Sequence, residues 1–80
     1  MGNDLPVLCQ GSANALGVLY AQGMLYDLGY FTDRDDIDSY FGPRTEAAVR
    51  KLQGDDGLPV TGKVDRDTWS DLISRWWTLP

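Results

Sequence analysis

Apolar residues recur at helical spacing in three stretches of the chain. In the first stretch they follow the spacing i, i+3, i+7, i+10, which places them on one helix face: Val18, Ala21, Leu25 and Leu28. Ser12 or Asn14 can cap this helix, and Gly29 supplies a C-terminal stop. We predict a helix from one of these caps to about residue 28. Gly17 and Gly23 lie in this stretch, which predicts close approach of another backbone or a later helix start.

Two further helices follow in the second half of the chain. Pro43 fits the first position of a helix, where its missing N–H has no partner to lose, and this helix runs to about Gln53. The Gly-Asp-Asp-Gly segment 54–57 is expected to break it. Its buried residues are expected to be Ala48, Val49 and Leu52. Asp65 caps a third helix with apolar residues at i, i+3, i+4 and i+7: Trp69, Leu72, Ile73 and Trp76.

The segments between the helices predict extended structure. Residues 58–64 are too rich in Pro and Gly for a helix and predict a turn with a short strand. We therefore predict an all-α fold, a compact three-helix bundle with short extended segments before its second and third helices. Residues 1–11 are an extended lead-in, residues 12–75 form one three-helix domain, and residues 76–80 are a C-terminal tail. Eighty residues suffice for one hydrophobic core.

A weak internal repeat connects the second and third helices. The residues Phe41, Thr45 and Val49 recur 23 positions later as Val64, Thr68 and Leu72. In both copies an apolar residue ends an extended piece, Thr stands in the first helical turn, and another apolar residue follows one turn on. This pattern predicts that the same extended segment and helix start are used twice against one core.

The charge balance of the chain limits its partners. Seven basic residues face twelve acidic ones, for a net charge of −5. Nucleic-acid binders concentrate Lys and Arg, and anionic membranes attract basic segments, so neither partner is expected. No apolar run approaches the roughly 20 residues that span a bilayer. Residues 1–4 lack the charged and apolar regions of a signal peptide, and we expect the chain to be a module of a longer protein.

The residues needed for common catalytic and metal chemistry are scarce. The chain has no His and one cysteine, Cys9, which disfavours a thiolate–imidazole pair, a zinc site and an internal disulfide. A domain this small leaves little protein wall to raise the pKa of a carboxyl group. The acidic loop with Asp33, Asp35 and Asp38 departs from the EF-hand pattern because Arg44 stands at the twelfth position. We therefore expect no enzyme activity, no cofactor and no metal.

Several segments together resemble one known family. The segment 38–49, Asp-Ser-Tyr-Phe-Gly-Pro-Arg-Thr-Glu-Ala-Ala-Val, is similar to the signature Asp-Gly-x-Phe-Gly-Pro-x-Thr-x-x-Ala-Val of the peptidoglycan-binding domain. The segments Leu28-Gly29-Tyr30, Gly62-x-Val64 and Thr68-Trp69-x-x-Leu72 extend the resemblance over about residues 11–73. Ser39 replaces the Gly of the signature, which predicts an ordinary φ at this position.

The resemblance implies the function of the chain. It predicts a non-catalytic three-helix module that binds peptidoglycan, through the stem peptide, the glycan or both. It also implies a monomer fused to a wall-lytic or wall-remodelling protein, located at the cell wall or outside the cell, or delivered by a phage lysin. The alternative is a protein-docking domain on the same fold, with exposed Trp77 and Leu79 as its anchor.

Two features of the sequence are candidate ligand sites. At the start of the second helix, the backbone N–H groups of Arg44 and Thr45 and the Arg44 guanidinium can hold a stem-peptide carboxylate. Asp38 and Tyr40 would flank this site. The alternative is that Thr45 caps the helix and Arg44 is solvated. The second feature is a set of aromatic side chains that can present a ring to sugars or aliphatic groups: Tyr30, Tyr40 and Trp77.

The remaining aromatic residues have other expected roles. Trp69 and Phe41 are expected in the core, and Trp76 continues the apolar face of the third helix. Trp77 can close the core, bind ligand or meet another chain. An exposed apolar patch around Trp77 would favour docking, whereas an open groove between the second helix start and the Tyr30 loop would favour wall binding.

Overall fold

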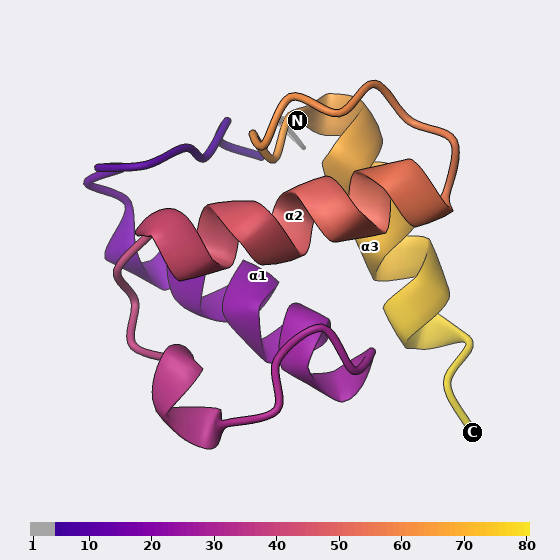
Figure 1. The fold of residues 1–80 in the computed structure, drawn as a ribbon, viewed down its shortest axis with the longest axis horizontal. Helices are drawn as coiled ribbons and strands as arrows, with labels where there is room; N and C mark the ends of the chain where they lie inside the picture. Colours follow the sequence, from indigo (N-terminus) through magenta and orange to yellow (C-terminus); the bar gives the residue numbers. More distant parts are fainter. Residues whose placement is uncertain (1–4) are drawn as a thin grey trace.

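The computed structural model describes residues 5–80 and confirms the predicted all-α fold. Within this part of the chain there are three α-helices, α1 (Ala15–Asp27), α2 (Pro43–Asp55) and α3 (Arg66–Trp77), and a 3₁₀ turn, η1 (Arg34–Asp36). Helix α1 packs against both α2 and α3, and α2 crosses the front of the molecule in Figure 1. Residues 1–4, which begin the predicted lead-in and carry the argument about a signal peptide, lie outside the described residues.

Side-chain caps begin the first and third helices. The Asn14 Oδ1 accepts a hydrogen bond from the Gly17 N–H at 2.8 Å, and the Asp65 Oδ1 accepts one from the Thr68 N–H at 3.0 Å. Asn14 is therefore the cap of α1, and Ser12 instead accepts from the N–H of Cys9. Because the Asn14 side chain folds back over the first turn, a Cβ at position 17 would lie only 3.0 Å from Asn14 Oδ1.

The ends of α2 and α3 differ from the sequence prediction. Helix α2 continues through Gly54 to Asp55, two residues past the predicted end at about Gln53, and it ends within segment 54–57 as predicted. The helix ends where the backbone takes a positive φ, +73° at Gly57, which lets Leu58 N donate to Gln53 O at 2.9 Å. Helix α3 continues to Trp77, so the first two residues of the predicted tail are helical.

The segment before α1 contributes to the core. Leu8 is fully buried and pairs with Val64, with Leu8 N donating to Val64 O at 3.0 Å and Val64 N donating to Leu8 O at 2.8 Å. This isolated antiparallel bridge stands in place of the short strand predicted within 58–64. The indole N–H of Trp69 donates to the carbonyl of Pro6 at 2.7 Å. The lead-in is therefore packed against the start of α3.

The core is formed by residues from all three helices and the segments between them. Phe41 and Trp69 are buried in it, as predicted, whereas Leu28 and Ile73 are only partly buried at its edge. The buried hydrophobic residues are Leu8, Val18, Ala21, Leu25, Phe31, Phe41, Ala48, Val49, Leu52, Val64, Trp69 and Leu72.

Two fully buried glutamines hold the segments that precede α2 and α3. The Gln22 Nε2 donates to Tyr40 O at 2.9 Å, to Thr45 Oγ1 at 3.0 Å and to Asp38 Oδ1 at 3.1 Å. Its Oε1 accepts from the backbone N–H groups of Asp38 and Ser39. The carboxamide thereby fixes the whole turn before α2 to the middle of α1.

Gln53 makes the same set of contacts in the second copy. Its Nε2 donates to Lys63 O at 2.9 Å and to the hydroxyls of Thr68 and Thr61 at 3.0 and 3.2 Å. Its Oε1 accepts from the N–H groups of Thr61 and Gly62, both at 3.0 Å. Each partner of Gln53 lies 23 residues after the equivalent partner of Gln22, so the predicted repeat is confirmed.

The repeat explains why the prediction of an ordinary φ at Ser39 was wrong. Ser39 has φ +64°, and Gly62, its equivalent in the second copy, has φ +77°. In both turns two successive N–H groups point at one glutamine oxygen, an arrangement that requires a left-handed residue. Ser39 therefore adopts the conformation that the family signature assigns to glycine.

We expect Ser39→Gly to stabilise the domain by about 0.5–1 kcal/mol. Glycine relieves a left-handed strain of about 1–2 kcal/mol but costs about 0.5–1 kcal/mol of unfolded-state entropy. Thermal unfolding followed by circular dichroism measures the change. Ser70→Gly is the matched control, because exposed Ser70 lies inside α3, where the same substitution should lower the melting temperature. A lower melting temperature for Ser39→Gly would contradict the strain argument.

Candidate functional site

Two adjoining hollows lie at the start of α2. The larger, about 270 Å³, lies between α2 and the loop after α1, and Tyr30, Arg44 and Lys51 are among its lining residues. The smaller, about 130 Å³, lies over the first residues of α2 and is lined by Asp38, Tyr40 and Thr45, among others. Asp36 and Arg44 line both hollows. We call the two hollows together the α2 groove. It lies between the start of α2 and the Tyr30 loop, where an open groove was expected to favour wall binding.

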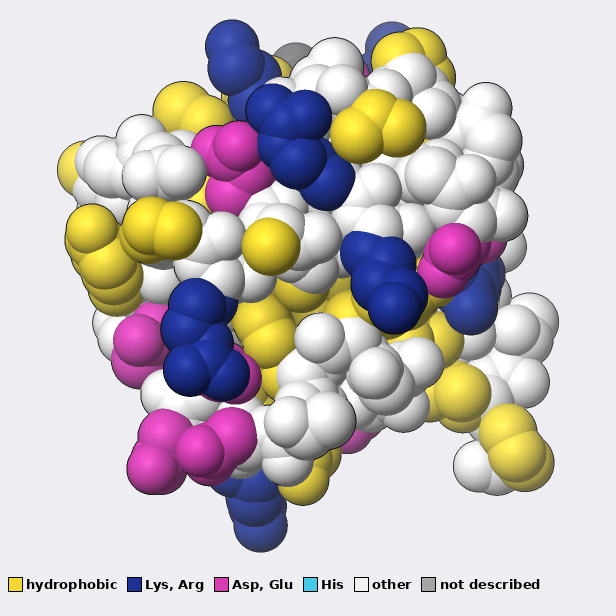
Figure 2. All heavy atoms as spheres, viewed as in Figure 1, with side chains coloured by type: hydrophobic (Ala, Val, Ile, Leu, Met, Phe, Trp, Pro, Cys, Tyr) yellow, Lys and Arg dark blue, Asp and Glu magenta, His cyan; other side chains and the backbone are white. Residues whose placement is uncertain are grey.

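The α2 groove combines two basic side chains, Arg44 and Lys51, with two acidic ones, Asp36 and Asp38. The Arg44 side chain is 76% exposed and makes one ion pair, from Nη2 to Asp36 Oδ2 at 3.1 Å. Exposed pairs of this kind contribute little, so the guanidinium retains donors for a ligand. Lys51, two turns further along α2, lines the same groove. On the face that α2 crosses, basic side chains flank exposed hydrophobic atoms (Figure 2).

The backbone at the start of α2 also presents donors. Gly42 is the N-cap and provides no side-chain hydrogen bond. Within residues 5–80 the N–H groups of Arg44 and Thr45 have no acceptor, whereas Glu46 N donates to Gly42 O. The positive end of the helix dipole therefore opens into the smaller hollow. An anionic group is the natural occupant of this position.

Thr45 contributes to the groove through its backbone rather than its hydroxyl. Its side chain is buried, and its Oγ1 accepts from Gln22 Nε2 at 3.0 Å. The alternative prediction, that Thr45 caps α2, was therefore wrong. The hydroxyl is instead part of the network that fixes the turn before the helix.

Asp38 and Tyr40 flank the smaller hollow. The Asp38 Oδ1 accepts from Tyr40 N at 3.0 Å and from Gln22 Nε2 at 3.1 Å, so its carboxylate is held in place. The Tyr40 side chain is 62% exposed, and its ring lies close to Gly42. A Cβ at position 42 would lie 2.5 Å from Tyr40 Cε2, so any larger residue there would displace the ring from its place beside the helix start.

Tyr30 lines the larger hollow, but its hydroxyl is engaged elsewhere. It donates to Asp55 Oδ2 at 2.8 Å and accepts from Arg75 Nη1 at 2.9 Å. The Arg75 guanidinium also lies 5.6 Å from the centre of the Tyr30 ring. Burial raises the pKa of the Tyr30 hydroxyl, and the hydrogen bond from Arg75 opposes this. Tyr30 therefore shapes the groove without offering its hydroxyl to it.

A carboxyl pair adjoins the Arg75 contacts. Arg75 Nη1 also binds Asp56 Oδ2 at 3.1 Å, and nearby Asp71 has one buried oxygen with no partner among the described residues. Burial and the neighbouring Asp56 raise the pKa of Asp71 to about 6. Neither Asp56 nor Asp71 lines the α2 groove. Sequence reasoning did not identify this pair, because it depends on the packing of α3 against the end of α2.

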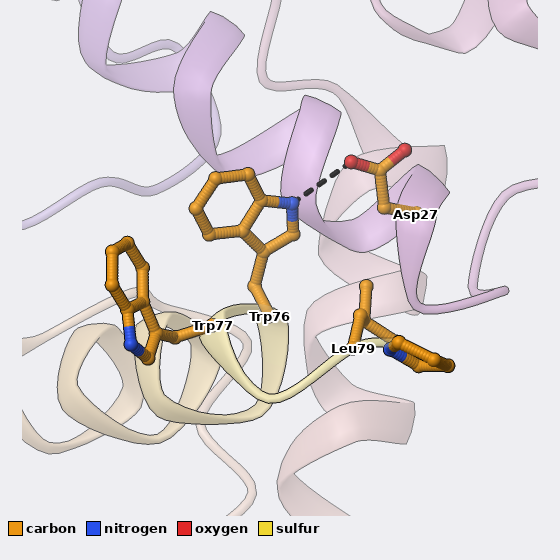
Figure 3. Close-up of a pocket in the computed structure, with 5 residues that line it drawn as sticks. Asp27, Trp76, Trp77 and Leu79 are labelled. Carbon is orange, nitrogen blue, oxygen red and sulfur yellow. Dashed lines mark hydrogen bonds between the residues drawn. The ribbon is translucent and has the colours of Figure 1, made fainter.

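Trp77 lies apart from the other predicted site residues. It is 78% exposed and lines a shallow hollow of about 670 Å³ with Asp27, Trp76 and Leu79. The Trp76 indole N–H donates to Asp27 Oδ2 at 2.8 Å, which joins the last turns of α3 and α1 (Figure 3). Trp76 is half-buried, but it is not among the described residues that form the core or pack against it. Of the six predicted site residues, five border the α2 groove and Trp77 does not.

Residues 5–80 contain neither a metal-binding cluster nor a membrane-spanning helix. In residues 5–80, no three His, Cys, Asp or Glu side chains are grouped so that they could hold a metal ion. In the acidic loop, Asp33 caps η1 and Asp36 pairs with Arg44. None of the helices in the described part of the chain combines the length and apolar character needed to cross a bilayer.

Comparisons with known proteins agree with this architecture. Residues 14–72 match the sequence profile of a family described as a putative peptidoglycan binding domain. The crystal structure of the SleB N-terminal domain superposes with a TM-score of 0.82 and 28% identity, over 94% of this chain and 99% of that one. An uncharacterised protein from Kitasatospora aureofaciens is 51% identical over 37 residues. That match covers 46% of this chain and spans only 31% of the relative's length. The chain therefore belongs to the peptidoglycan-binding domain family.

Proposed function

We propose that this chain is a non-catalytic module that binds bacterial peptidoglycan and is thereby located at the cell wall. The observation that carries the proposal is the α2 groove, where Arg44, Lys51 and free backbone N–H groups gather beside Asp36 and Asp38 in a domain of net charge −5. Membership of the family points to the polymer, and the groove points to the anionic part of it. The ligand in the groove is a carboxylate of the stem peptide.

Each part of the groove has a role in this proposal. The Arg44 guanidinium and the N–H groups of Arg44 and Thr45 bind the carboxylate oxygens. The exposed Tyr40 ring covers the aliphatic part of the peptide. Asp38 holds the Tyr40 backbone, so that the ring lies beside the helix start.

The module works by tethering in this proposal. The groove is open and its ion pair is exposed, so one copy binds weakly. Fusion to a wall-lytic or wall-remodelling protein converts this weak affinity into a high effective concentration at the substrate. Asp71, the carboxyl with a pKa raised to about 6, lies outside the groove and takes no part in the proposed ligand contacts.

Sedimentation with purified peptidoglycan, stripped of teichoic acid, tests the proposal. We expect saturable binding that Arg44→Ala weakens about tenfold, the effect of losing a charge-assisted hydrogen bond. Arg66→Ala is the matched control, because it removes the same charge from an exposed residue outside the groove. Equal affinities for the two variants would place the site elsewhere. Failure of the unmodified domain to sediment with several wall chemotypes would contradict wall binding.

The alternative function, a protein-docking domain, is favoured by one observation. Trp77 and Leu79 are 78% and 41% exposed at the end of the chain described here. Exposed apolar residues at this position would favour docking. Docking becomes the preferred function if the domain does not bind peptidoglycan in the sedimentation experiment.

A further inference from the structure

The hollow at the ends of α1 and α3 differs in chemical character from the α2 groove, because it is largely apolar. Its lining combines the indole rings of Trp76 and Trp77 with Leu79, Pro80 and the side-chain carboxylate of Asp27. No Lys or Arg is among its described lining residues. We call it the Trp77 hollow. Its occupant must tolerate a negative charge and provide apolar surface for an aromatic ring.

The two indole rings are held in different ways. The Trp76 ring is fixed by its bond to Asp27 Oδ2, and Figure 3 shows it standing between Asp27 and Trp77. The ring centres are 6.4 Å apart and the planes are inclined by 50°, so Trp77 does not stack on Trp76. The Trp77 ring, 78% exposed, is therefore available to a ligand. The C–H faces of pyranose rings are apolar and can stack on such a surface.

Asp27 selects against other occupants. Its Oδ1 has no hydrogen-bond partner in residues 5–80, although Oδ2 holds Trp76. An apolar protein segment laid over the hollow would desolvate this charge without compensation, and an anionic group would be repelled by it. A neutral ring with hydroxyl and amide N–H donors satisfies the free oxygen and covers the Trp77 ring at the same time.

We propose that the Trp77 hollow binds a neutral N-acetylated amino sugar of the peptidoglycan glycan strand. This inference rests on the proposed function for the identity of the polymer, and it adds a second site on it. The α2 groove takes the anionic peptide and the Trp77 hollow takes the neutral sugar. Two weak sites on one polymer raise the overall affinity without any strong single contact.

Titration with chitotetraose, a neutral oligomer of N-acetylglucosamine, tests the proposal without the peptide. We expect two-dimensional ¹H–¹⁵N NMR spectra to show saturable shifts of the Trp76 indole N–H and of backbone signals near Trp77. Trp77→Ala is expected to weaken binding about tenfold, and Asp27→Ala severalfold. Tyr20→Ala is the matched control, because Tyr20 is 59% exposed but does not line the hollow. Arg44→Ala, in the groove, is also expected to bind chitotetraose normally.

The possible outcomes separate this inference from the proposed function. Absence of saturable shifts, or equal affinity for Trp77→Ala, would overturn the sugar site. If Arg44→Ala still lost binding to whole peptidoglycan, wall binding would stand without the sugar site. Self-association that Trp77→Ala abolishes, with no response to sugar, would identify the hollow as a protein contact and overturn the inference. If Trp77→Ala weakens sugar binding but Arg44→Ala does not change the affinity for whole peptidoglycan, the sugar site in the Trp77 hollow would be supported. The assignment of the stem peptide to the α2 groove would then be wrong.

Discussion

Gln53→Leu is expected to lower the free energy of unfolding by about 4 kcal/mol, because several polar groups lose their partner at once. The carboxamide accepts from two backbone N–H groups, of Thr61 and Gly62, and donates to Lys63 O and two hydroxyls. Each buried group left unsatisfied costs about 1–3 kcal/mol. Thr61 and Lys63 are exposed, so water can satisfy part of the set.

The effect is large relative to the stability of the domain. The free energy of unfolding of native domains is about 5–15 kcal/mol, and a domain of 80 residues is expected toward the lower part of that range. Urea denaturation followed by circular dichroism measures the change. Gln10→Leu is the control, because exposed Gln10 makes one side-chain bond, to Glu46, and should change stability by less than about 0.5 kcal/mol. Similar midpoints for the two variants would show that the network contributes little.

Leu8→Ala is expected to lower the free energy of unfolding by about 3 kcal/mol, the usual effect of truncating a fully buried leucine. The loss includes the transfer of the removed atoms and the cavity left against Val64 and its neighbours. The same denaturation measurement applies. Val7→Ala is the matched control, since the neighbouring side chain is 60% exposed and its truncation should be nearly neutral. If both variants unfold alike, the segment before α1 does not belong to the core.

The helices were predictable because their signals are local. The apolar spacing of α1 and α3 and the caps Asn14 and Asp65 operate within one or two turns. Helix α2 runs two residues beyond its predicted end at about Gln53, because Gly54 by itself does not end the helix. A glycine ends a helix efficiently only where it takes a positive φ, and here Gly57 does so.

The features that were missed depend on distant partners. Leu8 is a single apolar residue in an extended segment, so no periodicity marks it, and its burial follows from pairing with Val64. Gln22 lies four residues after Val18, on the apolar face of α1. A polar residue in that position indicates a buried hydrogen bond, but its partners cannot be read from the local sequence.

The candidate site was predicted in position but not in every role. The residues at the start of α2 adjoin one another in sequence, so their grouping followed from the helix itself. The hydrogen bond that engages the Thr45 hydroxyl with Gln22 could not be predicted, because the two residues are 23 positions apart in the sequence. The separation of Trp77 from the groove likewise follows from the packing of the helices.

The glutamine networks and the lead-in also imply an order of assembly. The Gln53–Thr68 contact closes 15 residues of chain, Gln22–Thr45 closes 23, and Pro6–Trp69 closes 63. Loop-closure entropy makes the longest closure about 1.3 kcal/mol more costly than the shortest. We therefore expect the α2–α3 unit to form early and the lead-in to dock last. The folded domain should open first at this segment, releasing the Trp69 indole while the two glutamine networks remain closed.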